Sequence, residues 1–209
     1  MAVVYVLMYV HLMPLKRLVN SMNIMIVGVG GQGTLLASRI LGNVIISEGY
    51  DIKLSEVHGM SQRGGSVVTY VKYDEKVYSP IIDKGEADVI LAFEMLEAYR
   101  ALPYLKKGGK IIANNQMINP MPVIIGAMEY PKDIEKKMSE LVDLECFDAA
   151  SLAKEAGNIK AVNVVLIGVL AKTTDIEYSK WIEAIKNTVP AKLLDVNLKA
   201  FDLGYNLIK

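Results

Sequence analysis

The sequence predicts a three-layer α/β domain with a mostly parallel sheet, an antiparallel hairpin and a helical C-terminal third. From Asn23 onwards, short runs rich in β-branched residues alternate with segments of helical periodicity. Residues 24–29 form a continuous apolar run that ends in glycines, which is typical of a central strand covered on both faces. Beyond residue 163 only helical patterns follow. Together these observations predict a Rossmann-like fold.

The first elements follow from spacing. Residues 34–48 carry apolar side chains at helical intervals, and residues 52–57 then resemble a second strand. Residues 58–65 contain three glycines and no apolar periodicity, so we expect a loop. Residues 67–73 alternate between apolar and polar, and we expect Asp74 and Glu75 to turn the chain into residues 76–79 as an antiparallel hairpin.

The middle of the chain continues the alternation. We expect strands at 87–93, 110–115 and 143–147, and helices at 95–105, 133–141 and 149–156. Gly108 and Gly109 are expected to stop the first of these helices. Pro120 and Pro122 predict an extended segment before residues 123–126, because proline fixes one backbone angle and restricts the residue before it.

The last third is expected to be helical. Residues 163–172 are apolar nearly all round, as in a helix buried in a core or an interface. Residues 178–188 are amphipathic, and residues 192–207 are expected to be helical until Gly204 interrupts them. No repeat or linker appears, so residues 23–209 are interpreted as a single domain.

Residues 1–22 are interpreted as an N-terminal extension outside that domain. The apolar run at residues 2–13 is shorter than the roughly 20 residues of a membrane span. Its charges follow the run, whereas those of a signal peptide precede it. We expect Met22 to be the natural start and residues 1–21 to come from an upstream start codon. An extra element that packs on the domain and a membrane-surface anchor are the alternatives.

Composition excludes several classes of function. Hydrophobic residues make up 52% of the 209 residues, enough for a sizeable core, and 23 basic residues balance 23 acidic ones. A nucleic-acid-binding protein would usually be basic, so nucleic acid is not an expected partner. A membrane is not an expected partner either, because the apolar run at residues 2–13 is too short to span one. The single cysteine, Cys146, allows no internal disulfide, which fits a cytoplasmic protein.

Cys146 also limits the cofactors that the chain can hold. An iron–sulfur cluster needs several thiolates. Besides Cys146 only His11 and His58 are available, which does not make a Cys/His zinc site. We therefore assign no metal site to this chain. No residue of it is assigned a catalytic role.

The segment Gly28-Val29-Gly30-Gly31-Gln32-Gly33 matches G-x-G-x-x-G and lies between a predicted strand and a predicted helix. Such glycines permit a tight turn, and the helix N-terminus can then bind a phosphate. Glu56 could bind the ribose of a dinucleotide. Three readings stay open: the glycines only close the turn, they bind an anion or nucleotide, or they bind a nicotinamide or flavin.

The loop after the second predicted strand is more specific. It reads Glu-Val-His-Gly-Met-Ser-Gln-Arg-Gly-Gly-Ser over residues 56–66, and its Arg63 could form paired hydrogen bonds to a phosphate or carboxylate. With the glycine-rich turn, this segment resembles the small subunit of indolepyruvate:ferredoxin oxidoreductase, and more broadly the gamma subunits of 2-oxoacid:ferredoxin oxidoreductases. The likeness continues through residues 87–94, 163–168 and 197–205, so it covers essentially all of residues 23–209.

The resemblance implies a two-subunit enzyme that converts indolepyruvate and other aryl pyruvates to aryl-acetyl-CoA. CoA is the co-substrate and ferredoxin the electron acceptor. The large alpha subunit would carry thiamine diphosphate, magnesium and iron–sulfur clusters, while this chain alone would bind no cofactor. This chain has no Gly-Asp-Gly segment of the kind that holds the metal of thiamine diphosphate. The resemblance places these residues at a subunit contact or at the edge of the active-site cavity: Gly28, Gly30, Gly31, Gly33, His58, Gln62, Arg63, Gly64 and Gly65.

Two other functions stay open. The chain could be the gamma subunit of a related pyruvate or 2-oxoglutarate enzyme, or an independent Rossmann-type nucleotide-binding protein.

Four further features are given structural interpretations. His58 could act as a base, but in a chain without the cofactor a positioning or interface role is expected. Cys146 is expected to be a small buried side chain. Glu94 and Glu97 are expected in a solvated first helical turn. Tyr178 and Trp181, three residues apart, are expected to be packing residues, with an interface anchor as the alternative.

Overall fold

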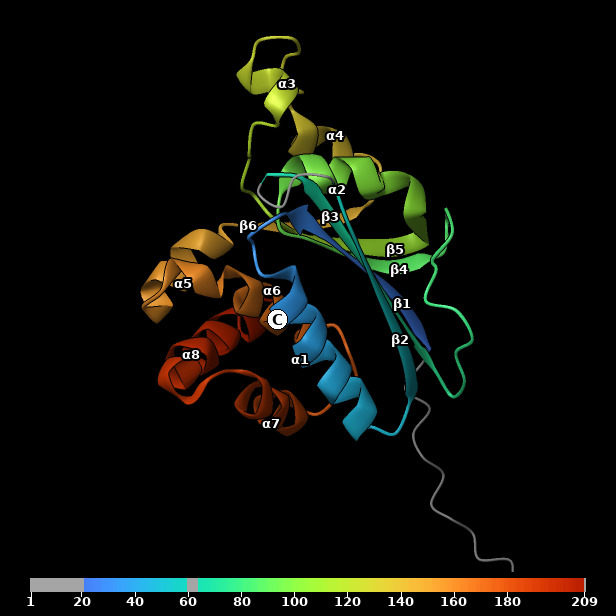
Figure 1. Ribbon diagram of the computed structural model, residues 1–209, viewed down its shortest axis with the longest axis vertical. Helices are drawn as coiled ribbons and strands as arrows, with labels where there is room; N and C mark the ends of the chain where they lie inside the picture. Colours follow the sequence, from blue (N-terminus) through green and yellow to red (C-terminus); the bar gives the residue numbers. More distant parts are fainter. Residues whose placement is uncertain (1–20, 60–63, 209) are drawn as a thin grey trace, which may run out of the picture.

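The computed structural model describes residues 21–59 and 64–208, and these form a sheet with helices on both faces (Figure 1). The strand order is β2-β3-β1-β4-β5-β6. The strands are β1 (Met22–Val29), β2 (Asp51–His58), β3 (Ser66–Asp74), β4 (Ala87–Ala92), β5 (Leu105–Asn114) and β6 (Asp143–Phe147). Residues 1–20 lie outside the described part, so the interpretation of residues 1–21 as a segment upstream of a natural start at Met22 stays a prediction.

The sheet is mixed, as predicted, but its hairpin lies elsewhere. β1, β4, β5 and β6 pair in parallel, whereas β3 is antiparallel to both β1 and β2. The partner of β3 in the hairpin is β2, and the glycine-containing loop at 59–65 joins them. The expected pairing with residues 76–79 is wrong, because those residues form no strand. Val77 N–H instead donates to the carboxylate of Asp51 at 3.0 Å.

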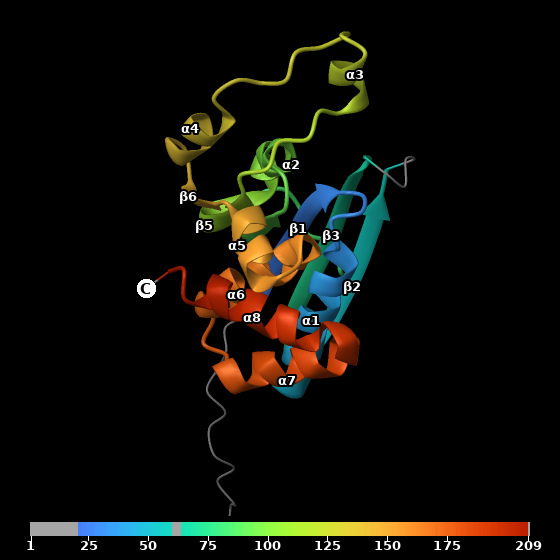
Figure 2. The same ribbon diagram turned by 90° about the vertical axis from the view of Figure 1, so that its left-hand side faces the viewer.

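β1 shows why its sequence is apolar throughout. Ile24 and Ile26 face one core, and Met25 and Val27 face the other, since successive side chains of a strand point to opposite faces. The first core is covered by helices of the N- and C-terminal parts: α1 (Thr34–Ser47), α5 (Ala149–Ala156), α6 (Val162–Lys172), α7 (Tyr178–Thr188) and α8 (Leu194–Tyr205). The second is covered by α2 (Met95–Ala101) and α4 (Ile134–Ser139). Figure 2 shows the two groups of helices on opposite sides of the sheet.

The second helix is shorter than predicted. After α2, a 3-10 turn η1 (Leu102–Tyr104) leads directly into β5, which already contains Gly108 and Gly109. Pro103 lies in the first turn of η1, where its missing N–H costs nothing, and Gly109 approaches the backbone carbonyl of Asp88 too closely for a side chain. The glycine pair therefore belongs to a strand and does not stop a helix.

The C-terminal helices pack as the apolar pattern predicts, but Gly204 does not interrupt α8. A Cβ atom at Gly204 would lie 1.9 Å from the carbonyl oxygen of Val165 in α6. A Cβ at Gly168 would likewise lie 2.3 Å from the carbonyl oxygen of Phe201 in α8. The two glycines let the backbones of α6 and α8 touch. Trp181 is fully buried and stacks on Phe201, which confirms its predicted packing role. Tyr178 is 40% exposed, although its ring packs edge-on against Tyr205.

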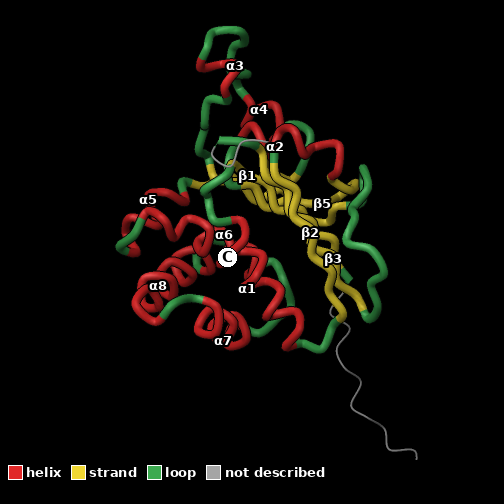
Figure 3. The backbone as a smooth tube through the Cα atoms, in the orientation of Figure 1, coloured by secondary structure: helices red, strands yellow, loops and turns green. Residues whose placement is uncertain are grey.

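An excursion separates β5 from α4. It contains the short helix α3 (Met121–Ile124) and otherwise consists of loop (Figure 3). The extended segment predicted at 120–122 is therefore only half right. Pro120 is extended, with φ −71° and ψ 162°, but Pro122 lies in the first turn of α3, where a helix tolerates proline.

None of the helices in the described part of the chain is long and apolar enough to cross a bilayer.

Candidate functional site

The glycine-rich turn joins β1 to α1, next to the place where the connections of neighbouring strands go to opposite faces of the sheet. After β1 the chain crosses one face as α1, and after the neighbouring β4 it crosses the other face as α2. Ligands of open α/β sheets bind in such a crevice at the carboxyl ends of the strands. Gly33 stands before α1 with φ +84°, and a Cβ there would lie 2.5 Å from the Asn163 amide nitrogen. Its position therefore requires glycine.

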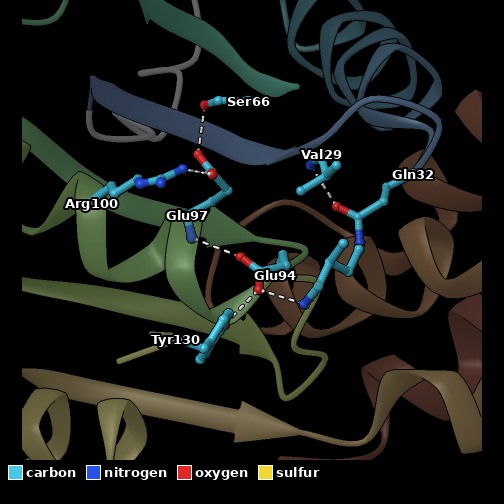
Figure 4. A network of polar contacts seen from close by, with 8 residues as sticks. Val29, Gln32, Ser66, Glu94, Glu97, Arg100 and Tyr130 are labelled. Atoms are coloured by element: carbon cyan, nitrogen blue, oxygen red, sulfur yellow. Dashed lines mark hydrogen bonds and ion pairs between the residues drawn. The ribbon is translucent and has the colours of Figure 1, made fainter. Parts of the chain in front are cut away.

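A side chain of the turn itself fills this crevice. The Gln32 carbonyl accepts a hydrogen bond from Val29 N–H at 2.7 Å. The Gln32 amide donates to the carbonyl of Phe93 at 3.0 Å and to the Gln116 side chain at 3.2 Å. Gln32 thereby joins the ends of β1, β4 and β5, as Figure 4 shows in part. This arrangement favours the reading in which the glycines close the turn.

Gln32 was missed by sequence reasoning, because it occupies a variable position of the G-x-G-x-x-G pattern. Asn163 was noted only for its resemblance to a family helix. In the structure its amide donates to the carbonyl of Gly33 at 3.1 Å, which fixes the start of α1 from α6. A buried amide at the start of an otherwise apolar helix was the available signal, since buried polar groups need partners.

The segment at residues 56–66, here called the second motif, has its described residues at the same end of the sheet as the glycine-rich turn. The two segments are in contact. Gly30 N–H donates to the carbonyl of Gly65 at 2.9 Å, so the two glycine motifs are in contact. Gly64 has φ +81°, a conformation that favours glycine. Gly31 has open space where a Cβ would stand. Gln62 and Arg63 lie outside the described residues, so their predicted contacts are not placed.

His58 and Glu56 form a pair on β2. The His58 Nε2 atom is 2.6 Å from the Glu56 carboxylate, and 57% of the His58 side chain is exposed. The other Glu56 oxygen accepts from Thr69 at 2.9 Å and, more weakly, from Thr34 at 3.5 Å. The Glu56 carboxylate thus already has three protein partners. In a dinucleotide-binding protein it would instead have to accept hydrogen bonds from the ribose hydroxyls. His58 presents its ring to the surface, where a partner could contact it.

Two acidic residues at the start of α2 are buried, contrary to the solvated turn that we expected. Glu94 is 1% exposed and Glu97 is 5% exposed. Glu94 caps α2 by accepting from Glu97 N–H at 2.9 Å, which confirms the part of the prediction that concerns the helix dipole. Its other oxygen accepts from Ile118 N–H at 2.9 Å and from the Tyr130 hydroxyl at 2.8 Å. The excursion after β5 therefore covers it.

Glu97 links α2 to the second motif (Figure 4). Its carboxylate accepts from the hydroxyl of Ser66 at 2.6 Å and from the Arg100 guanidinium at 2.5 Å. Ser66 is the first residue of β3, directly after the 59–65 loop. Burial, followed by the neighbouring Glu94 carboxylate, raises the pKa of Tyr130 above its usual range, so this phenol stays protonated and serves as a donor. The network fixes the base of the loop.

A pocket of about 830 Å³ opens beside this network, between the excursion and α4. Met95, Asn115, Tyr130 and Ile134 are among the residues that line it. Its lining includes none of the candidate residues that the structure describes, so the pocket and the glycine motifs are separate features of one end of the molecule.

Cys146 is half-buried, and its sulfur lies 3.7 Å from the sulfur of Met95. Burial, and then the nearby Glu135 carboxylate, raise the pKa of this thiol to about 12. The thiol is therefore protonated at neutral pH, and it is a poor nucleophile and metal ligand. Within the described part of the chain, no group of three or more His, Cys, Asp and Glu side chains could hold a metal ion.

Comparisons with known proteins cover nearly the whole chain. Residues 23–207 match the family model described as pyruvate ferredoxin/flavodoxin oxidoreductase. The indolepyruvate oxidoreductase subunit IorB of Thermococcus kodakarensis is 47% identical over 90% of this chain and 96% of its own. The IorB subunit of Pyrococcus horikoshii is 46% identical over the same shares.

More distant matches also extend over most of the chain. The pyruvate/ketoisovalerate oxidoreductases common subunit gamma of Thermococcus kodakarensis is 27% identical over 86% of this chain and 92% of its own. The crystal structure of the keto/oxoacid ferredoxin oxidoreductase gamma subunit from Geobacter sulfurreducens superposes with a TM-score of 0.66 at 22% identity. It covers 88% of this chain and 96% of that one.

Proposed function

The chain belongs to the pyruvate ferredoxin/flavodoxin oxidoreductase family, and we propose that it is the small, non-catalytic subunit of an indolepyruvate:ferredoxin oxidoreductase. The enzyme would oxidatively decarboxylate indolepyruvate and other aryl pyruvates to aryl-acetyl-CoA and pass the electrons to ferredoxin. One observation carries the choice of branch. Identity to the IorB subunits reaches 47%, against 27% to the common gamma subunit of the pyruvate and ketoisovalerate enzymes.

The chain's own chemistry supports a division of labour between two subunits. One protonated, half-buried thiol cannot hold an iron–sulfur cluster, which needs several thiolates. These residues do not fit a cluster, and in this proposal the large subunit holds the clusters, thiamine diphosphate and magnesium. CoA and the oxoacid are substrates of the assembled enzyme. In the assembled enzyme, the small subunit would contribute the surface at the carboxyl ends of its parallel strands, which contacts the large subunit.

That surface is built from the two glycine motifs. Gly28, Gly30, Gly31 and Gly33 belong to the turn that contains Gln32, and the carbonyl of Gly65, which follows Gly64, accepts from Gly30 N–H. Exposed His58 lies at the same end of the sheet. In this proposal Gln62 and Arg63, which lie outside the described residues, complete the surface. We assign this surface to contact with the large subunit or to the edge of the active-site cavity.

The function is tested by reconstitution. The purified chain should show no iron or thiamine absorbance and should not reduce an acceptor dye. Activity with indolepyruvate, CoA and ferredoxin should appear when the large subunit is added. Turnover by the chain alone, or an assembled pair that is inactive towards every aryl pyruvate, would contradict the proposal. Micromolar binding of NAD or NADP in calorimetry would favour the independent nucleotide-binding protein, which the Gln32-filled crevice disfavours.

Replacing Arg63 by alanine tests the second motif. We expect either the KM for CoA or the dissociation constant of the complex to rise by about tenfold to a hundredfold, because hydrogen bonds to charged groups contribute about 1.5–3 kcal/mol. The urea midpoint should not change. Arg39→Ala is the matched control, since Arg39 is an exposed arginine on α1. If both variants assemble and turn over like the wild type, Arg63 makes no contact of the kind proposed.

A further inference from the structure

The excursion between β5 and α4 carries an unusual surface. We call residues 117–129, which include α3, the arm. Five of its large apolar side chains are 65–69% exposed: Met117, Met121, Ile124, Ile125 and Met128. Residues 111–128 contain no charged residue, in a chain of which 22% is charged. Contiguous exposed apolar surface without charge is typical of a protein interaction site.

The arm is anchored firmly at both ends. Met95 N–H donates to the carbonyl of Gln116 at 2.9 Å, directly before the arm. The buried Glu94 carboxylate holds Ile118 at the start of the arm and Tyr130 just after its end. The Gln116 side chain is bonded in turn to Gln32 of the glycine-rich turn. Pro120 and Pro122 further restrict the backbone around α3. A fixed presentation of apolar side chains lowers the entropy cost of binding.

The position of the arm indicates which partner it binds. Figures 1 and 2 both show α3 at the end of the molecule opposite α7, beyond the ends of β2 and β3 that flank the second motif. A partner that covers the two glycine motifs therefore also meets the arm. A second copy of this chain docked on the arm would compete for that same end. Apart from Glu129 at its end, the arm carries no charge. It therefore fits an apolar groove in the partner, since a charged groove would lose its solvation without gaining an ion pair.

We propose that the arm inserts α3 and its flanking methionines into an apolar groove of the large catalytic subunit. This inference rests on the proposed function and adds the surface through which the small subunit is held. Ile124 and Ile125 are the expected anchors, because they stand on and beside α3, one next to the other, at 65% and 69% exposure.

The test compares binding of purified variants to the purified large subunit. Ile124→Asp combined with Ile125→Asp should weaken the complex by about a hundredfold or more, because central apolar anchors carry most of the energy of an interface. The far-UV spectrum and the urea midpoint should stay those of the wild type, since both side chains are exposed. Tyr78→Asp is the control: Tyr78 is 88% exposed and follows the opposite end of β3. It should bind like the wild type.

The outcomes are distinguishable. If the wild-type chain assembles with the large subunit and the arm variant binds equally well, the arm is not the docking element, while the proposed function stands. If the wild-type chain fails to bind the large subunit, both proposals fail. If the isolated chain forms dimers in sedimentation that the arm variant lacks, the occupant is a second copy and the inference is overturned.

Discussion

Replacing Gly204 by alanine is expected to lower the free energy of unfolding by about 3 kcal/mol or more. The new Cβ would lie 1.9 Å from the carbonyl oxygen of Val165 and 2.8 Å from its carbonyl carbon. Both are backbone atoms of α6, so no side-chain rotation relieves the contact. Overpacking of this kind costs about 1–3 kcal/mol and more when the backbone must move. The higher helix propensity of alanine, worth about 1 kcal/mol, offsets only part of this.

Gly42→Ala is the matched control, measured by urea denaturation beside Gly204→Ala. Gly42 is also a buried glycine inside a helix, but a Cβ there would meet only a side-chain methyl of Leu54, at 3.4 Å. This variant should be as stable as the wild type or slightly more stable, because the flexible Leu54 can shift and alanine favours the helix. Equal urea midpoints for the two variants would show that α6 and α8 can separate without cost.

Gly204 also shows where prediction from sequence stops. The helical pattern predicted α8 correctly, but Gly204 was expected to interrupt it. That expectation came from the low helix propensity of glycine, which takes no account of the residues that pack against it. In the structure Gly204 lies against α6, some 40 residues earlier, and that contact decides its role. The apolar run of β1 and the glycines after it were predictable, because burial on both faces and the turn act on neighbouring residues.

The hairpin shows the same limit. The alternation of residues 67–73 correctly indicated an antiparallel strand, which the structure places at Ser66–Asp74, but alternation does not indicate the pairing partner. An acidic dipeptide at 74–75 resembled a tight turn. The true connection is the longer segment between β2 and β3, which was predicted as a loop but not as the connection of the hairpin. β3 also pairs along its other edge with β1, where Met25 lies opposite Tyr70 and Val27 opposite Val68, so one of its two neighbours comes from a more distant part of the sequence.

The candidate site was predicted in part. The two glycine motifs were placed at the ends of strands, and the structure brings Gly30 and Gly65 into contact. The burial of Glu94 could not be foreseen, because the groups that cover it, Ile118 N–H and the Tyr130 hydroxyl, come 24 and 36 residues later. An acidic helix start resembles a solvated cap in sequence unless the fold of a distant loop is known.

Glu94→Ala is expected to lower the free energy of unfolding by about 4 kcal/mol and to release the arm. The substitution removes the acceptor of three donors at once: Glu97 N–H, Ile118 N–H and the Tyr130 hydroxyl. Each buried donor that loses its partner costs about 1–3 kcal/mol, and loss of an N-cap alone costs about 0.5–2 kcal/mol. Because Glu94 holds both ends of the arm, limited proteolysis should cut residues 117–129 first.

Two milder variants separate the carboxylate from its individual partners. Tyr130→Phe removes one donor and leaves the Glu94 oxygen bonded to Ile118 N–H, so it should cost only about 1 kcal/mol. Glu94→Gln keeps a carbonyl oxygen for the cap of α2 but turns an amide donor towards two other donors, so its cost should lie between those of the alanine and phenylalanine variants. We therefore expect the urea midpoint to fall least for Tyr130→Phe, more for Glu94→Gln and most for Glu94→Ala. This order is expected if the single Glu94 carboxylate binds both the first turn of α2 and the residues at the two ends of the arm. If Glu94→Ala were as stable as Tyr130→Phe, the arm would be held by its backbone contacts alone, and the α2 cap would be independent of it.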